Sequence, residues 1–209
     1  MFRRFALIAT IVPALLTAAC GAAEESGLQA VRDDQRMMFF EVPSEWTVLQ
    51  ELDLTGVIDT PFVSQSDIIL PVLSRVVFEA GVGTELVTNP AAASVPIGSA
   101  VVRSISSSAR DVMSRVLLAE AVFPLRQQET AEVLSKSDIS LGDGFDGVQL
   151  VVRYTDAVRD QDAVVAILAV TDPEVTRMYS FAVGCTIDCF VDYQQAILDA
   201  MDSWLVDTR

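Results

Sequence analysis

The sequence has no histidine and a single lysine, Lys136, and these gaps remove many of the residues from which active sites are built. Without histidine, Ser-His pairs, Cys-His pairs and the usual zinc sites cannot form. The chain also has no G-x-S-x-G turn, phosphate-binding loop or G-x-G-x-x-G motif. Lys136 could act as a base to a serine, but it lies in a predicted strand, where we expect it to face solvent. Ordinary hydrolytic and transfer chemistry therefore has no visible agent.

Two acidic clusters are the remaining candidates for chemistry. The first could bind calcium through oxygen ligands and comprises Asp138, Asp143 and Asp146. Its spacing is not that of an EF-hand loop, and Asp-Gly pairs are typical of β-turns. The second is an acidic turn that comprises Asp156, Asp160 and Asp162. A solvated turn explains it better than paired catalytic carboxylates do. We therefore expect no cofactor and no metal, with calcium at the first cluster as a weak alternative.

The N-terminus has the three-part layout of a secretory signal. Arg3 and Arg4 precede an uncharged apolar run over 5–16, and small residues lead into Cys20. The run is too short for a stable membrane span. The segment L-T-A-A-C at 16–20 resembles the lipobox of bacterial lipoproteins, whose cysteine receives a diacylglycerol and becomes the new N-terminus. We expect a signal peptide over 1–19 and a lipid anchor at Cys20 on the outer side of a membrane. The alternative is a plain signal peptide with an accidental cysteine.

The mature chain would be strongly acidic. Removing 19 of the 209 residues leaves 190, and losing Arg3 and Arg4 moves the net charge from −15 to −17. Such a surface repels phosphate backbones, so no nucleic-acid partner is expected. The segment 20–36 is small, acidic and without apolar periodicity, which predicts a flexible tether. The rest, 37–209, has the length of a single domain.

Two cysteines remain once Cys20 is assigned to lipid. Cys185 and Cys189 form an even pair in what would be an oxidising compartment. Their sulfurs can meet if Cys185 lies just ahead of a helix and Cys189 in its first turn. We predict a disulfide; two free buried thiols are the alternative.

Apolar patterning and turn residues predict mainly strands. The predicted strands lie at 38–42, 46–49, 68–78, 99–106, 131–139, 148–154, 163–170 and 175–183. Short Gly-, Asp- and Pro-containing joints connect the last four, which favours an antiparallel meander. Residues 89–94 are expected to form a loop. The pattern predicts an α+β fold, an antiparallel sheet of about six strands with helices packed on it.

Two helices are expected. The first spans 108–122, begins at the serines 106–108 and buries a stripe made of Val112, Val116, Ala119 and Phe123. The second spans 191–206, and its buried stripe consists of Tyr193, Ile197, Met201 and either Trp204 or Leu205.

Short motifs resemble the PsbP-like superfamily. They are Phe40-Glu41-Val42-Pro43-x-x-Trp46, Gly147-Val148-x-x-Val151-x-x-Tyr154, and Tyr179-Ser180-Phe181 followed by the closing helix. In element order the resemblance covers most of 37–206, with 52–96 the poorest fit. The branch most similar in kind is the LpqN-type lipoproteins of the cell envelope, which share the lipobox. The resemblance implies an α/β/α sandwich and a scaffold used largely for docking onto other proteins.

Aromatic residues allow two interpretations. The set could line a ligand groove between sheet and helix, although core packing explains it more simply. The main groove candidates are Phe40, Trp46, Tyr179 and Trp204, with Phe39 and Phe181 beside them.

Three functions therefore compete. We expect a non-enzymatic, membrane-anchored module that binds another envelope protein or a wall component. The second candidate is a carrier of a lipid or other apolar molecule, and the third is a carboxylate-dependent enzyme.

Overall fold

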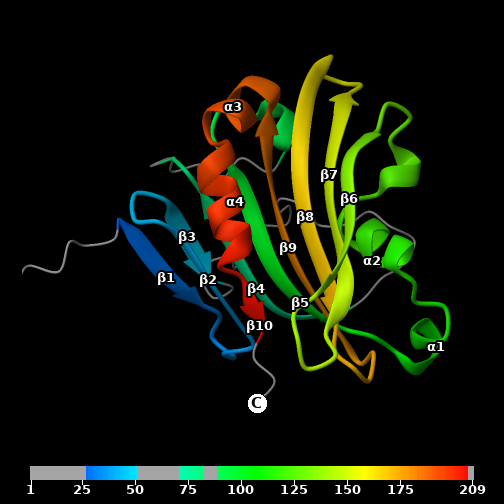
Figure 1. Cartoon of the computed structure of the whole chain (residues 1–209). Helices are drawn as coiled ribbons and strands as arrows, with labels where there is room; N and C mark the ends of the chain where they lie inside the picture. The colour runs from blue at the N-terminus through cyan, green and yellow to red at the C-terminus, as the bar shows by residue number, and fades with distance from the viewer. Residues whose placement is uncertain (1–26, 51–70, 82–88, 207–209) are drawn as a thin grey trace, which may run out of the picture.

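An antiparallel sheet of seven strands forms the centre of the molecule, in the order β3-β4-β5-β9-β8-β7-β6 (Figure 1). The computed structural model describes residues 27–50, 71–81 and 89–206. The strands are β3 (Thr47–Gln50), β4 (Val72–Glu79), β5 (Ile97–Ser104), β6 (Glu132–Ser140), β7 (Asp146–Asp156), β8 (Gln161–Thr171) and β9 (Arg177–Thr186). The predicted α+β class and the meander of the last four strands are confirmed. The expected strand number, about six, was one too low.

A second sheet has three strands in the order β1-β2-β10. They are β1 (Leu28–Arg32), β2 (Met38–Pro43) and β10 (Leu205–Val206). Strand β1 corrects the expected tether, because residues 28–32 pair with β2 instead of forming a linker. The sequence of β1 lacks the alternation of apolar and polar residues that usually indicates a strand, because only Val31 is buried in this edge strand. The predicted signal peptide and Cys20 lie outside the described residues.

The first predicted helix is divided into α1 (Ser107–Arg110) and α2 (Arg115–Val122). The serines explain the break, because Ser106 caps α1 and Ser114 caps α2, each accepting a backbone N–H three residues on. The predicted stripe was therefore half wrong. Val112 and Val116 are 63% and 51% exposed, whereas Ala119 and Phe123 are buried as expected. A short 3-10 turn, Leu125–Gln127, follows.

The second predicted helix, 191–206, corresponds mainly to α4 (Gln194–Asp202). A separate helix, α3 (Ile187–Asp192), begins four residues before the predicted start, and Tyr193 lies at the break between the two. Ile197, Met201 and Trp204 are buried as predicted. Leu205 is instead 57% exposed, because the chain leaves the helix and pairs with β2 as β10. In the described ranges, no helix is long and apolar enough to cross a membrane.

The core lies on both faces of the large sheet. Residues 163–171 of β8 are buried in succession, so both faces of this strand are covered. On one face, aromatic and aliphatic side chains of β2, β4, β5 and β9 pack with α4. On the other face, α2 packs over β7 and β8. The arrangement is the sandwich that the sequence predicted, with the three-stranded sheet and α4 on one side.

A candidate binding groove beside helix α4

The aromatic residues proposed for a ligand groove belong to the core. Phe40, Trp46, Tyr179 and Trp204 are all buried. The Phe40 ring lies 5.4 Å from the ring of Phe78 and 5.2 Å from that of Phe181, measured between centroids. Aromatic rings at these separations stabilise a core through both apolar burial and edge-to-face contacts. In the described structure these four residues are therefore core residues, and none of them lines the groove described below.

The weak calcium candidate is not assembled. Asp138 lies on β6 and pairs with Arg115 of α2, with an N–O distance of 2.8 Å. Asp143 occupies a turn at a φ of 48°, and Asp146 begins β7. Over the residues that the structure describes, no group of acidic or cysteine side chains is arranged to hold a metal ion. An ion pair thus accounts for Asp138, and the glycine turn and the start of β7 account for Asp143 and Asp146. Lys136 is exposed on β6, as predicted.

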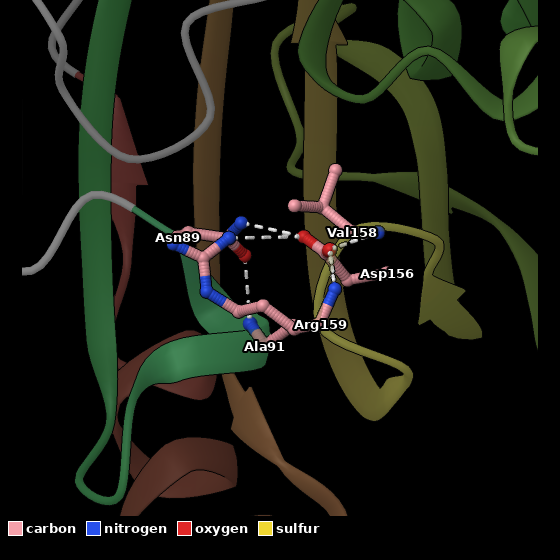
Figure 2. Close-up of polar contacts among 5 residues, drawn as sticks. All are labelled: Asn89, Ala91, Asp156, Val158 and Arg159. Carbon is pink, nitrogen blue, oxygen red and sulfur yellow. Dashed lines mark hydrogen bonds and ion pairs between the residues drawn. The ribbon is translucent and has the colours of Figure 1, made fainter.

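The acidic turn of β7 and β8 has a structural function at Asp156. Its carboxylate accepts hydrogen bonds from the Val158 and Arg159 backbone N–H groups, each at 2.9 Å, and from the Asn89 side-chain Nδ2 at 2.7 Å (Figure 2). The Asn89 Oδ1 in turn accepts from the backbone N–H of Ala91 at 2.9 Å. These bonds fasten the hairpin tip to the 3-10 turn Pro90–Ala92, which packs on β8 and β9.

The other acids of this turn do not form a catalytic pair with Asp156. Asp160 sits at a φ of 51°, and Asp162 is bonded to Arg153 and to the Thr155 hydroxyl. Burial, followed by the nearby Asp156 carboxylate, raises the pKa of Tyr154 to about 12, so this phenol stays protonated at neutral pH. The cluster is accounted for by turn formation.

The predicted disulfide joins Cys185, at the end of β9, to Cys189, in the first turn of α3. Both cysteines are buried beside Ala93 and Ile97. The bond therefore fixes the point at which the chain leaves the large sheet, and so helps to position α3 and α4.

A surface groove of about 290 Å³ lies between α4 and the three-stranded sheet. Its surface is mainly apolar, and half of its lining residues are apolar, namely Leu28, Pro43, Ala196 and Ala200. The other half is polar and consists of Glu41, Gln195, Asp199 and Ser203. The groove thus combines an apolar surface with two carboxylates, and none of the described residues that line it is basic.

Hydrogen bonds hold the two walls of this α4 groove together. The Ser203 hydroxyl accepts a hydrogen bond from the Glu41 backbone N–H at 2.8 Å and donates to the Ala200 carbonyl oxygen at 2.8 Å. Strand β10 pairs with β2 at Met38 and Phe39. The bond between Ser203 and Glu41 adds a further contact to β2, two residues beyond this pairing. The Gln195 amide donates to the Asp199 carboxylate at 2.7 Å. The two walls of the groove, helix α4 and strand β2, are therefore joined through Ser203.

Comparison with known proteins places the fold. No family model and no curated protein matches the chain. The solved structure of cyanobacterial PsbP (CyanoP) from Synechocystis sp. PCC 6803 has a TM-score of 0.52 and 15% identity, covering 91% of this chain and 99% of that one. LpqN, which is involved in cell envelope biogenesis of Mycobacterium tuberculosis, has a TM-score of 0.50 and 15% identity, covering 86% and 90%. The chain has a PsbP-like fold. At these identities the likeness concerns the fold alone.

The groove of this PsbP-like domain was missed in the sequence, although a signal for it was present. Residues 178–206 contain four aspartates and no lysine or arginine. An amphipathic helix that packs on a core usually carries both signs of charge on its outer face. A one-sided charge on the last helix, next to the acidic residue of the opening Phe-Glu-Val-Pro motif, would have pointed to this surface.

Proposed function

We propose that the chain is a lipid-anchored, extracytoplasmic binding module of the bacterial cell envelope, without catalytic activity of its own, and that it contacts an envelope partner through the α4 groove. The observation that carries this proposal is the groove itself, which is open, has a mainly apolar surface with a few polar groups, and is held by two regular elements. Such concave sites with a few placed polar groups are the usual places for ligands to bind. The lipobox-like segment ending at Cys20 supports the anchor, which would confine the domain near a membrane and raise its local concentration.

The two alternatives find less support in the structure. A lipid carrier needs an apolar cavity between sheet and helix, and the aromatic residues expected to line it fill the core instead. A carboxylate-dependent enzyme needs two opposed acids in a cleft, whereas the aspartates singled out for that chemistry form turns or ion pairs. Fold likeness cannot decide function, so the proposal depends on the groove.

Site-specific photo-crosslinking in intact cells of the native host tests the proposal. A benzophenone side chain at Gln195, which is exposed in the groove, is compared with one at Val112, which is exposed on the far helix pair. We expect a discrete adduct from position 195 only. The Ala196→Trp variant should abolish it by filling the groove, and Gln194→Trp, on the same helix but outside the lining, should preserve it. Thermal unfolding verifies that each variant is folded, and Ala196→Leu serves if the tryptophan is not tolerated.

Three results would overturn the proposal: adducts from position 112 but not 195, an adduct unaffected by filling the groove, or sustained turnover of an envelope substrate by purified protein. Turnover abolished by Asp143→Asn or Asp160→Asn would restore the enzyme hypothesis. Separation of the wild-type protein and the Cys20→Ser variant into membrane and soluble fractions tests the anchor independently of the groove.

A further inference from the structure

We infer that the occupant of the α4 groove is an extended basic segment of a partner polypeptide, which pairs along β1 and places an arginine or lysine side chain among the groove carboxylates. This inference rests on the proposed function and specifies the chemistry of its partner. Two features carry it: the electrostatics of α4, and the edge strand that forms part of the groove.

The charges on α4 lie at the end of the helix that disfavours them. Asp199 and Asp202 occupy the last turn, where the helix dipole already places partial negative charge. The first turn contains no acid and the last turn no base, which is the reverse of the arrangement that stabilises a helix. Glu41 of β2 adds a third carboxylate on the facing wall. The helix terminus and the two lining carboxylates, Glu41 and Asp199, therefore place negative potential in the groove, and Asp202 adds to it from the same turn of the helix.

Among the residues that the structure describes, no arginine or lysine forms an ion pair with these acids. The described ion pairs involve Arg115, Arg126, Arg153 and Arg159, and none of them reaches an acid of α3, α4 or β2. Of the described side chains, the one that donates a hydrogen bond to Asp199 is the neutral Gln195 amide. A basic ligand complements such a site, and charge-assisted hydrogen bonds to its carboxylates would orient the ligand.

Strand β1 explains why the ligand should be a polypeptide. In the described part of the chain β1 pairs with β2 alone, and at its far end the Arg32 carbonyl accepts a hydrogen bond from the Gln50 side chain at 2.9 Å, so the backbone groups left for pairing on its other edge lie toward Leu28. Leu28 of this strand lines the groove and is 43% exposed. An extended segment added to β1 would place alternate side chains over the groove face, which is the geometry of β-strand addition. The volume of about 290 Å³ suits one or two side chains and is at the lower limit for a separate small-molecule site.

Peptide binding tests the inference with the full mature protein, purified in detergent with its anchor. The probe is a fluorescent form of the peptide Ac-Thr-Val-Arg-Val-Arg-Val-Thr-NH2, and binding is followed by fluorescence anisotropy. The paired variant Glu41→Gln, Asp199→Asn removes two groove charges and keeps side-chain shape. We expect it to raise Kd by about tenfold or more, because charge-assisted contacts are the stronger ones. The matched control Asp188→Asn, Asp192→Asn removes two charges from α3 and should change Kd by less than about twofold, since it lies outside the groove.

A second peptide separates charge from shape. Replacing both arginines by citrulline preserves size and backbone and removes the charge, so this peptide should bind about tenfold more weakly or worse. Equal loss in the groove and control variants would show a general charge effect, and equal binding of the citrulline peptide would show an apolar site; either result overturns the inference. Detectable binding of neither peptide overturns it as well. The crosslinking experiment separates this failure from failure of the proposed function. If the peptides fail but the Ala196→Trp variant still abolishes the groove crosslink in cells, the groove binds a partner and only the inference of a basic segment is wrong.

Discussion

Asp156 supports a quantitative test of how the hairpin tip is held. Its side chain is 13% exposed and accepts hydrogen bonds from the Asn89 amide and from two backbone N–H groups of its own turn. The turn donors can bond to water when the carboxylate is lost, whereas the Asn89 amide loses a charged acceptor in a partly buried place. Losing such a bond costs about 1.5–3 kcal/mol, so we expect Asp156→Ala to lower the free energy of unfolding by about 2 kcal/mol.

Urea denaturation of Asp156→Ala, Asn89→Ala and the double variant measures the coupling directly. Because the two side chains are bonded to each other, their effects should be non-additive by about 1 kcal/mol. Additivity to within about 0.3 kcal/mol would refute the argument, since it would mean that the two residues stabilise the protein independently.

The same carboxylate predicts a pH dependence. The hydrogen bond from the Asn89 side chain is the largest cause that holds the pKa of Asp156 below its ordinary value of 3.8. A lowered folded-state pKa contributes stability above the unfolded-state value and loses it as the pH falls through the folded-state value. The stability advantage of wild type over Asp156→Asn should therefore be full at pH 7 and shrink below about pH 4. An advantage that is constant with pH would contradict this assignment.

Three further predictions concern the anchor, the disulfide and the core. Cys20→Ser should release the protein from the membrane fraction at high salt, and retention of the variant would remove the lipid-anchor hypothesis. The non-reduced, unfolded mature protein should show no alkylatable thiol at Cys185 or Cys189, and replacing both by alanine should cost about 2 kcal/mol, because the bond closes only a short loop. Phe40→Ala should cost about 3–5 kcal/mol in denaturant titrations, since Phe40 is fully buried; an unchanged stability with altered ligand binding would instead indicate a groove residue.

The strands of the large sheet could be predicted because two local signals agree there. Each strand from β6 to β9 combines a run of β-forming residues with turn chemistry at both ends, and the observed bounds differ from the predicted ones by no more than three residues. The disulfide was also predictable, since its geometry depends only on a strand end followed by a helix start. Most of the region 52–96 lies outside the described residues, and β4 pairs antiparallel with β3 and β5 where it is described.

The helices were harder to delimit, because a capping side chain and a mid-helix side chain look alike in a sequence. Ser114 begins a new helix, yet one serine inside an apolar periodic pattern predicts continuation. Strand β1 was missed for a related reason: its pairing depends on β2 and not on its own composition. The groove depends on contacts between residues over 150 positions apart, such as Glu41 with Ser203, which no local pattern contains.

The placement of the α4 aspartates distinguishes a general acidic surface from a site. A chain with a net charge of −15 needs acids somewhere for solubility, and they cost least where no like charge lies nearby. At the end of α4, each acid opposes the helix dipole at a cost of about 0.3–1 kcal/mol. Acids that serve only solubility could lie at exposed strand and turn positions, where they would not oppose a helix dipole. Solubility alone therefore does not explain acids at a helix end beside Glu41. Residues that oppose local stability tend to be those that a function requires. The disulfide and the buried face of α4 hold the helix in place despite these charges, and its outer face is where we propose that a basic partner binds.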